Sequence, residues 1–200
     1  MDPGNDPSRA DEIENLLHSN ATGGAMSAPS KEELERFVAT FLYSREAFLV
    51  DDVLHVDRDS REIEARMDTT RLLPVGRFQV GDLRVHPRHV SAPDLLLLTG
   101  NLGCLHAYFL HGCRWDEGWV GFGNRIHRAD FRRLVTIGPP LRLQSKETRV
   151  REGPKRVMLR YEFRFWQDGE MAYFGDQSAM FVKGRALGTI PRAKSLSLHG

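Results

Sequence analysis

The chain has 200 residues, of which 40% are hydrophobic and 28% are charged, a composition that suits one globular domain with a full core. Its 28 Lys and Arg residues nearly balance its 27 Asp and Glu residues, so no strong positive field favours nucleic acid or an anionic membrane. No apolar run approaches the roughly 20 residues of a membrane span, and the first residues lack the basic and apolar regions of a secretory signal. We therefore expect a cytoplasmic protein without a membrane span.

The first part of the chain predicts an extension followed by a helix. Residues 1–30 are rich in Asp, Asn, Pro, Ser and Gly, which favours a disordered extension with at most a short helix at 10–18. Ser30 and Glu33 then form a capping-box pattern, and apolar residues recur after them at helical spacing. This pattern predicts an amphipathic helix over 31–43.

Most of the remaining segments alternate between apolar and polar residues, as strands do. Residues 48–56 and 62–67 predict two strands joined by a turn. Four longer strands are predicted further on, with turn signals between them, at about 118–131, 140–151, 156–167 and 170–183. The chain is thus predicted to form a single domain over 31–184, followed by a flexible tail at 185–200.

Between the two groups of strands, the sequence predicts a buried helix at about 92–112. Ser91 can cap its start, Pro93 fits its first turn, and Asp94 places a negative charge at its positive end. Residues 95–110 are apolar on nearly every face, which is typical of a helix inside the core. We therefore predict an α+β fold in which an antiparallel sheet of about five to six strands wraps around this helix.

This arrangement resembles the hotdog superfamily, and two of its branches share short segments with the chain. In the beta-hydroxyacyl-ACP dehydratases, a strand similar to residues 48–54 precedes a His-containing loop and a Pro-capped central helix. Their late segment is similar to residues 128–140. This likeness covers about 46–183 and implies the hotdog fold.

The second branch is the FcoT-type long-chain acyl-CoA thioesterases. Their segment G-H-F-N-A-V-E-L-I-L is similar to residues 88–97, and their N-terminal helix ends in Tyr-Ser, like Tyr43 and Ser44 here. The likeness covers about 31–183. It implies an acyl-CoA or acyl carrier protein substrate and, because hotdog domains usually pair across a two-fold axis, a homodimer or higher homo-oligomer with shared active sites.

The sequence departs from the dehydratase pattern at both catalytic positions. When Pro93 is aligned with the helix-start proline of that family, the carboxylate position falls on Thr99 and the loop histidine position on Val85, next to His86. Dehydration needs a base and an acid, and a threonine hydroxyl is too weak an acid. The dehydratase reading thus depends on His86 alone.

The thioesterase pattern is also only partly present. Asp94 matches the acidic residue at the start of its central helix, but its two catalytic asparagine positions fall on Ser91 and Gly100. Ser91 retains a hydroxyl donor, whereas Gly100 has no side chain. Asn101 is one residue away and would substitute only after a shift in helical register.

The residues themselves suggest how an acyl thioester would be handled. The N–H groups near Leu95 and Leu96, at the positive end of a buried helix, are expected to bind the carbonyl oxygen. Asp94 would activate water or attack directly, assisted by His89 or Ser91. As an alternative, Asp94 only stabilises the helix, Ser91 only caps it, and the loop histidines bond to backbone.

Other residues are predicted to bind the substrate. The apolar helix, with Gly100, is expected to line an acyl slot near Tyr43. Thr99 and Asn101 interrupt an apolar helix, so they face either a pocket or a subunit contact. Arg132 and Arg133 are candidates for binding phosphate groups of the substrate, or are solvated charges.

No cofactor or metal site is predicted. Cys104 and Cys113 lie in one apolar segment without a Cys-x-x-Cys motif, so two free buried thiols are expected. His106 and His111 are five residues apart, a spacing that does not place them on one helix face.

The sequence therefore favours an acyl-thioester hydrolase. The alternatives are a 3-hydroxyacyl-thioester dehydratase or isomerase that uses His86, and a non-catalytic acyl-binding subunit.

Overall fold

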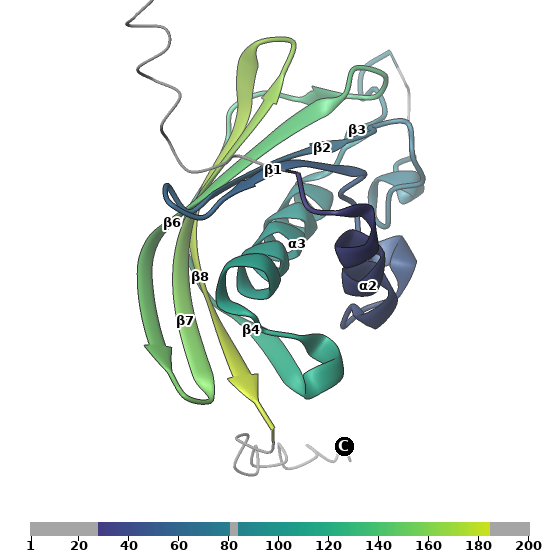
Figure 1. The fold of residues 1–200 in the computed structure, drawn as a ribbon. Helices are drawn as coiled ribbons and strands as arrows, with labels where there is room; N and C mark the ends of the chain where they lie inside the picture. Colours follow the sequence, from purple (N-terminus) through teal and green to yellow (C-terminus); the bar gives the residue numbers. More distant parts are fainter. Residues whose placement is uncertain (1–27, 81–83, 185–200) are drawn as a thin grey trace, which may run out of the picture.

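The computed structural model describes residues 28–80 and 84–184, and in this part of the chain a curled antiparallel sheet holds a long helix (Figure 1). Six strands form the sheet in the order β1-β2-β6-β7-β8-β4, and a small second sheet pairs β3 with β5. The strands are β1 (Asp52–Asp57), β2 (Glu62–Met67), β3 (His89–Val90), β4 (Trp119–Phe131), β5 (Val135–Thr136), β6 (Leu141–Gly153), β7 (Arg156–Gln167) and β8 (Glu170–Lys183). The helices are α2 (Lys31–Thr40) and α3 (Ala92–His111), with three short 3₁₀ turns, Arg45–Ala47, Gly76–Phe78 and Trp115–Glu117.

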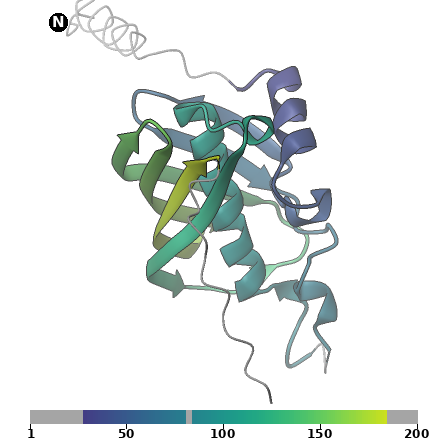
Figure 2. The ribbon, with the colours of Figure 1, turned by 90° about the horizontal axis from the view of Figure 1, so that it is seen from below.

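Helix α3 is the predicted central helix, and its ends lie where its sequence signals place them. The hydroxyl of Ser91 accepts a hydrogen bond from the N–H of Asp94, and the Asp94 side chain accepts one from the N–H of Ser91. Gly112 ends the helix in the left-handed conformation, with φ of 63°, which glycine adopts without strain. The helix has apolar residues on all faces because the sheet covers one side and α2 lies on another (Figure 2).

Helix α2 covers α3 through an aromatic cluster. The fully buried ring of Phe37 lies 5.0 Å from that of Tyr108 and 5.4 Å from that of Phe48, measured between centroids. The helix begins at the predicted Ser30 cap but ends at Thr40, whereas the prediction extended it to 43. It ends early because Phe41 takes an extended backbone conformation and packs against Phe48, with 5.2 Å between ring centroids.

The long strands follow the predicted alternation. In β7, Val157, Leu159, Tyr161, Phe163 and Phe165 are buried against the helix, while the residues between them face outward. Each of the four long strands lies within about two residues of its predicted range, and the antiparallel register of β6, β7 and β8 joins them through the expected hairpins. The predicted fold class is confirmed.

The range predicted for the first strand was too long, and the pair of short strands β3 and β5 was not predicted. Strand β1 begins at Asp52, although the prediction began at 48. Residues 48–50 are buried, but the N–H of Leu49 donates to a side chain of α3 instead of a neighbouring strand. Strands β3 and β5 have two residues each, too short to produce a readable alternation.

Two predictions fall on residues outside the described ones: most of the N-terminal extension at 1–30, with its short helix at 10–18, and all of the C-terminal tail at 185–200. Among the helices that the structure describes, none is long and apolar enough to cross a membrane.

Candidate functional site

A cavity of about 190 Å³ lies between α3 and the strands β4 and β8. Its walls are mostly apolar. Helix α3 contributes Leu96, Gly100 and Cys104, and Phe41 and Tyr43 lie where α2 leads into the next segment. The strand side includes Gly121, Gly123, Phe163, Ala179 and Phe181. The cavity therefore runs beside the middle of the central helix, not at its tip.

Two glycines of α3 explain why the cavity lies there. A Cβ atom added to Gly100 would meet no atom within 4 Å, so the missing side chain leaves open space in the cavity. At Gly103 an added Cβ would lie 3.6 Å from the Tyr161 ring, and the Tyr161 hydroxyl donates to the Gly103 carbonyl oxygen at 3.3 Å. Gly103 thus allows close packing of helix and sheet, whereas Gly100 leaves space.

A chain of polar groups borders the cavity on the side of β8. The Thr99 hydroxyl lies 2.7 Å from the Leu96 carbonyl oxygen and 3.0 Å from the side-chain oxygen of Gln177. The Gln177 amide nitrogen is 3.0 Å from the Tyr173 hydroxyl. Burial raises the pKa of Tyr173, against the opposing effect of that hydrogen bond. Thr99 and Gln177 both line the cavity and supply neutral hydrogen-bonding groups.

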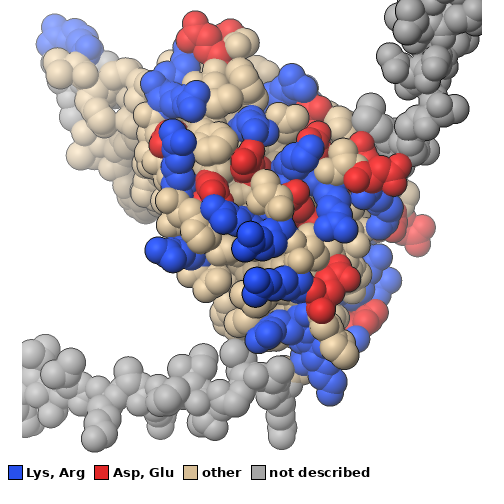
Figure 3. All heavy atoms as spheres, turned by 90° about the vertical axis from the view of Figure 1, so that its left-hand side faces the viewer, with Lys and Arg blue, Asp and Glu red and all other residues tan. Residues whose placement is uncertain are grey.

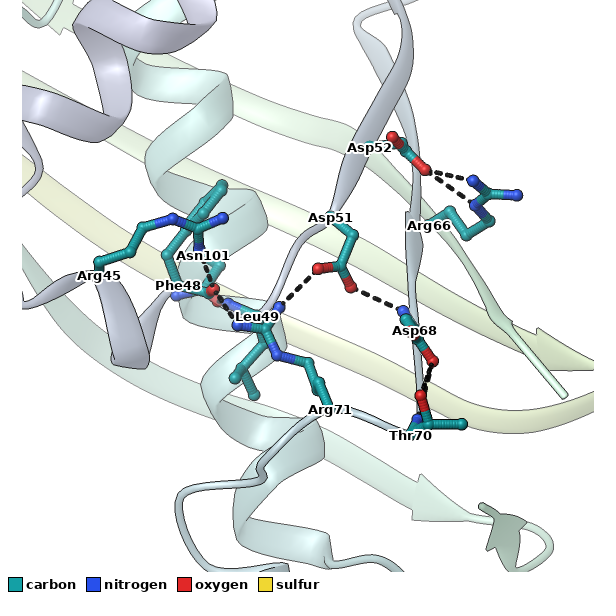
Figure 4. A network of polar contacts seen from close by, with 10 residues as sticks. All are labelled: Arg45, Phe48, Leu49, Asp51, Asp52, Arg66, Asp68, Thr70, Arg71 and Asn101. Carbon is teal, nitrogen blue, oxygen red and sulfur yellow. Dashed lines mark hydrogen bonds and ion pairs between the residues drawn. The ribbon is translucent and has the colours of Figure 1, made fainter. Parts of the chain in front are cut away.

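Asn101 also lines the cavity, but its amide is used to hold the chain that leads into β1 (Figure 4). Its side-chain oxygen accepts from the N–H of Leu49 at 2.8 Å, and its nitrogen donates to the Ala47 carbonyl oxygen at 3.2 Å. Arg71 supports the same segment, because it donates to the Phe48 carbonyl oxygen at 3.1 Å and to Asp51 at 2.9 Å. Asn101 is thus a structural residue in this arrangement.

Asp94, predicted as the base, is fully buried and does not line the cavity. Its carboxylate accepts hydrogen bonds from the N–H of Val75 at 2.9 Å, the N–H of Gly76 at 2.8 Å, and the hydroxyl of Ser91 at 2.6 Å. A fourth contact, from the N–H of Ser91, measures 3.3 Å. The carboxylate therefore ties the loop at Val75 and Gly76 to the helix start, and the geometry does not support water activation by Asp94 or Ser91.

The predicted carbonyl-binding site at the helix tip is also not available. The N–H of Leu95 donates to the Ser91 carbonyl oxygen at 3.0 Å, and the Leu95 side chain is buried in the core. Leu96 faces the cavity with its side chain. The prediction placed free donors one turn too late along the helix, because a capped helix already uses the N–H groups at these positions.

The two loop histidines lie apart from the cavity. His86 is exposed, and its ring packs edge-to-face on His89 with 5.0 Å between centroids. Nδ1 of His89 is 2.9 Å from the Pro87 carbonyl oxygen, and Nε2 is 3.1 Å from the Gln79 amide nitrogen. Both ring nitrogens are therefore within hydrogen-bond distance of neighbouring protein groups. His89 is thus held as a loop residue.

Arg132 and Arg133, predicted to bind phosphate, both have acidic neighbours. Arg133 forms an ion pair with Glu170, and Arg132 lies 3.8 Å from a carboxylate oxygen of Asp130. Their charges are therefore partly neutralised.

The structure places a buried ionic network at the other end of α3, which the sequence analysis did not predict. One oxygen of Glu147 lies 3.0 Å from Nδ1 of His106 and 2.8 Å from Nε2 of His111. Nε2 of His106 is 2.8 Å from the Ser145 hydroxyl, and Nδ1 of His111 pairs with Glu152. The five-residue spacing was read as separating the two histidines, but two different ring nitrogens reach the same oxygen. Glu147 lies on β6 and reaches the two histidines only because β6 packs near α3 in the fold. A local sequence pattern therefore could not predict this network.

Burial and hydrogen bonding set the protonation of this network. Although burial opposes it, the hydrogen bonds from the two histidines lower the pKa of Glu147 to about 2. Burial lowers the pKa of His106 below its ordinary value. For His111, burial is outweighed by hydrogen bonds and charge from Glu147 and Glu152, which raise its pKa. Near neutral pH, the network holds an anionic Glu147 beside a neutral His106.

Neither cysteine is a nucleophile in this environment. Burial raises the pKa of both Cys104 and Cys113 to about 12, so each remains a thiol near neutral pH. Both are free cysteines, as predicted, but of the two only Cys113 is buried as expected, because Cys104 is half-buried and lines the cavity. In the described part of the chain, no group of three or more His, Cys, Asp or Glu residues is placed to hold a metal ion.

Comparison with known proteins gives a likeness of fold. No family model and no curated protein matches the sequence. Among solved structures, a candidate thioesterase from Shewanella oneidensis superposes with a TM-score of 0.54 at 11% identity, covering 76% of this chain and 99% of that chain. A mutant thioesterase from Pseudomonas aeruginosa covers 79% of this chain and 97% of its own, and one from Haemophilus influenzae covers 75% and 90%; both have 15% identity and a TM-score of 0.46. The chain has the hotdog fold, in which a curled sheet surrounds a central helix.

Proposed function

We propose that this protein binds acyl thioesters and hydrolyses them, with the acyl chain in the cavity beside α3. The observation that carries the proposal is the apolar cavity opened by Gly100 and bordered by the polar groups of Thr99 and Gln177. Apolar walls suit a hydrocarbon chain, and a few fixed polar groups suit the thioester end. The named thioesterases of the same fold are consistent with this class of substrate.

In this proposal, Thr99 and Gln177 orient the thioester carbonyl. The side-chain amide of Gln177 can donate a hydrogen bond to the carbonyl oxygen, in a cavity that Phe163 and Phe181 also line. This role replaces the helix-tip donors predicted from the sequence. The substrate is an acyl-CoA or an acyl carrier protein, whose thioester ends are chemically alike.

The base that activates water is proposed to come from a second copy of the chain. Among the described residues that line the cavity, none is Asp, Glu or His. Strand β4 pairs only with β8 in the described sheet, so its other edge is open, and Phe122 and Ile126 on it are exposed. An open edge with apolar side chains favours pairing with another strand, and β4 forms one wall of the cavity.

A second candidate function is acyl binding without catalysis. The same observation favours it, because a cavity without an acid or base can bind a thioester but lacks the groups for hydrolysis. A dehydratase has less support, since His86 is exposed and lies apart from the cavity.

The experiment that separates these functions uses a panel of saturated and 3-hydroxy acyl-CoAs of different chain lengths. Free thiol and enoyl absorbance are followed together, and binding is measured by calorimetry in the same samples. We expect thiol release without enoyl product. Binding without thiol release would support the non-catalytic function, and enoyl formation would support dehydration. Absence of both binding and turnover would contradict the proposal.

A further inference from the structure

A second hollow lies on the outer face of the sheet, the side turned away from α3. It has a volume of about 180 Å³ and crosses β4, β8, β7 and β6. Its polar lining comprises Asn124, His127, Arg149, Arg151, Arg160 and Ser178. Figure 3 looks at the molecule from the sheet side and shows Lys and Arg side chains spread over much of this face, with acidic groups between them.

The arginines in this hollow carry an unbalanced charge. Arg149 on β6 lies directly opposite Arg160 on β7 in the strand register, and like charges in that position repel each other. Arg160 is neutralised by Asp176, with contacts of 2.7 and 2.5 Å. In the described structure, Arg149 and Arg151 have no acidic partner.

The nearby acidic groups are already engaged by other cations. Glu162 pairs with Arg164, and Asp130 pairs with Arg128 at 2.6 Å. Glu152, next to Arg151 in the chain, turns to His111. The hollow therefore keeps a net positive charge that the fold does not neutralise.

The remaining groups of the hollow can also serve an anion. Nε2 of His127 is 3.3 Å from the Ser178 hydroxyl, and Asn124 adds a side-chain amide. Guanidinium groups present paired N–H donors that match the oxygens of a phosphate group. An anion in the hollow would relieve the repulsion between Arg149 and Arg160 and accept hydrogen bonds from neutral donors.

The hollow and the cavity lie on opposite faces of the same part of the sheet, formed by β8 and β4. Ser178 lines both. Gly123 lines the cavity and the next residue of β4, Asn124, lines the hollow, at an irregularity where β4 shifts its register against β8. A ligand with an apolar end in the cavity and a phosphate-bearing end in the hollow would pass around β4, the edge strand of the described sheet.

We propose that Arg149, Arg151 and Arg160 form a binding site for the phosphate groups of the thioester carrier. The identity of that ligand rests on the proposed function, but the binding of phosphate does not. The phosphates could belong to coenzyme A or to a phosphopantetheine arm, which share the same chemistry.

Calorimetry with ligands that lack an acyl chain tests the site directly. The probes are inorganic pyrophosphate, adenosine 3′,5′-bisphosphate and phosphopantetheine, each at low ionic strength. The variants are the wild type, R149Q, R151Q and the double variant R149Q/R151Q. The control is R58Q, which removes one exposed charge in the turn between β1 and β2. All replaced side chains are exposed, and equal thermal midpoints would show that each variant folds.

We expect at least one probe to bind, with affinity at least tenfold weaker in the double variant and within twofold of wild type in R58Q. Binding of the bisphosphate would identify coenzyme A as the source, and binding of phosphopantetheine alone would identify a carrier arm. No binding of any probe, or equal binding by the double variant, would overturn the site. Because no probe has an acyl chain, a failure of hydrolysis would leave this result unaffected.

Discussion

Two buried carboxylates form hydrogen bonds near the two ends of α3, and their partners differ. Asp94, at the start of the helix, receives backbone N–H groups and a serine hydroxyl on both of its oxygens. Glu147 lies on β6 near the other end of the helix, and one of its oxygens forms hydrogen bonds with two imidazole rings. Its second oxygen is buried and has no hydrogen-bond partner in the described structure. Backbone and hydroxyl donors do not titrate near neutral pH, whereas imidazoles do. The comparison therefore predicts that the contacts of Glu147 with the two histidines depend on pH.

The largest effect is expected from Asp94→Asn. The new amide would replace one carboxylate oxygen by an NH₂ group, so that donors face the N–H group of either Val75 or Gly76 in a fully buried site. Leaving buried donors unpaired costs about 1 to 3 kcal/mol each, so we expect the free energy of unfolding to fall by roughly 3 to 5 kcal/mol. Urea denaturation measures this, with the exposed Asp59→Asn as control. Unchanged stability together with lost hydrolysis would instead support the catalytic role predicted from the sequence.

A smaller loss is expected from Glu147→Gln. The substitution removes the charge that faces His106 and His111 but keeps the side-chain shape. Hydrogen bonds to a charged group contribute about 1.5 to 3 kcal/mol, so a loss near 2 kcal/mol is expected at neutral pH. Glu152→Gln is the matched control, because this side chain is 58% exposed and its ion pair is worth about 1 kcal/mol or less. Equal losses in both variants would remove the distinction between buried and exposed partners.

The pH dependence of stability sharpens the same comparison. The pKa of Glu147 is lowered from 4.5 to about 2, so its contribution is present above about 4.5 and is lost as pH falls toward 2. The lowered pKa of His106 also reduces stability as pH falls below 6.5. The raised pKa of His111 acts in the opposite sense, since its contribution is lost as pH rises through the raised value. We expect the Glu147→Gln variant to show a weaker fall in unfolding free energy than wild type between pH 4.5 and 2; parallel curves would contradict the assignment.

The smallest effect is expected midway between the two ends, at Gly100→Ala. An added methyl group meets no atom within 4 Å, and alanine favours a helix over glycine by about 0.5 to 1 kcal/mol. Thermal unfolding should show a gain of this size. A loss of stability would mean that the space beside Gly100 is filled by other atoms in solution.

The sequence predicted the elements well because their signals are local. The Ser91 cap, the Gly112 stop and the alternation in β7 each act within a few residues, and the structure confirms them. The order of the elements predicted an α+β fold, and the resemblance to the hotdog superfamily implied the hotdog arrangement. The site was harder to predict, because residue type alone does not tell whether a polar side chain faces a ligand or another part of the fold.

Asp94 and Asn101 illustrate this limit. Both are polar residues on an apolar helix, and both were expected to act on a substrate, yet their partners are the N–H groups of segments far away in the sequence. Thr99 and Gly100 were also singled out, and they do border the cavity. The role of Gln177 could not be predicted, because it depends on how β8 packs against α3.

Filling the cavity at Gly100 tests the central claim most directly. The dissociation constant of a long-chain acyl-CoA would be measured by calorimetry for wild type, for Gly100→Leu, and for Gly153→Leu at the exposed end of β6. The Gly100→Leu variant is expected to fold, because a Cβ atom at position 100 meets no atom within 4 Å. The leucine side chain would, however, occupy the space proposed for the acyl chain. The account predicts binding at least tenfold weaker in Gly100→Leu and unchanged in Gly153→Leu. Wild-type affinity in a folded Gly100→Leu variant would contradict it.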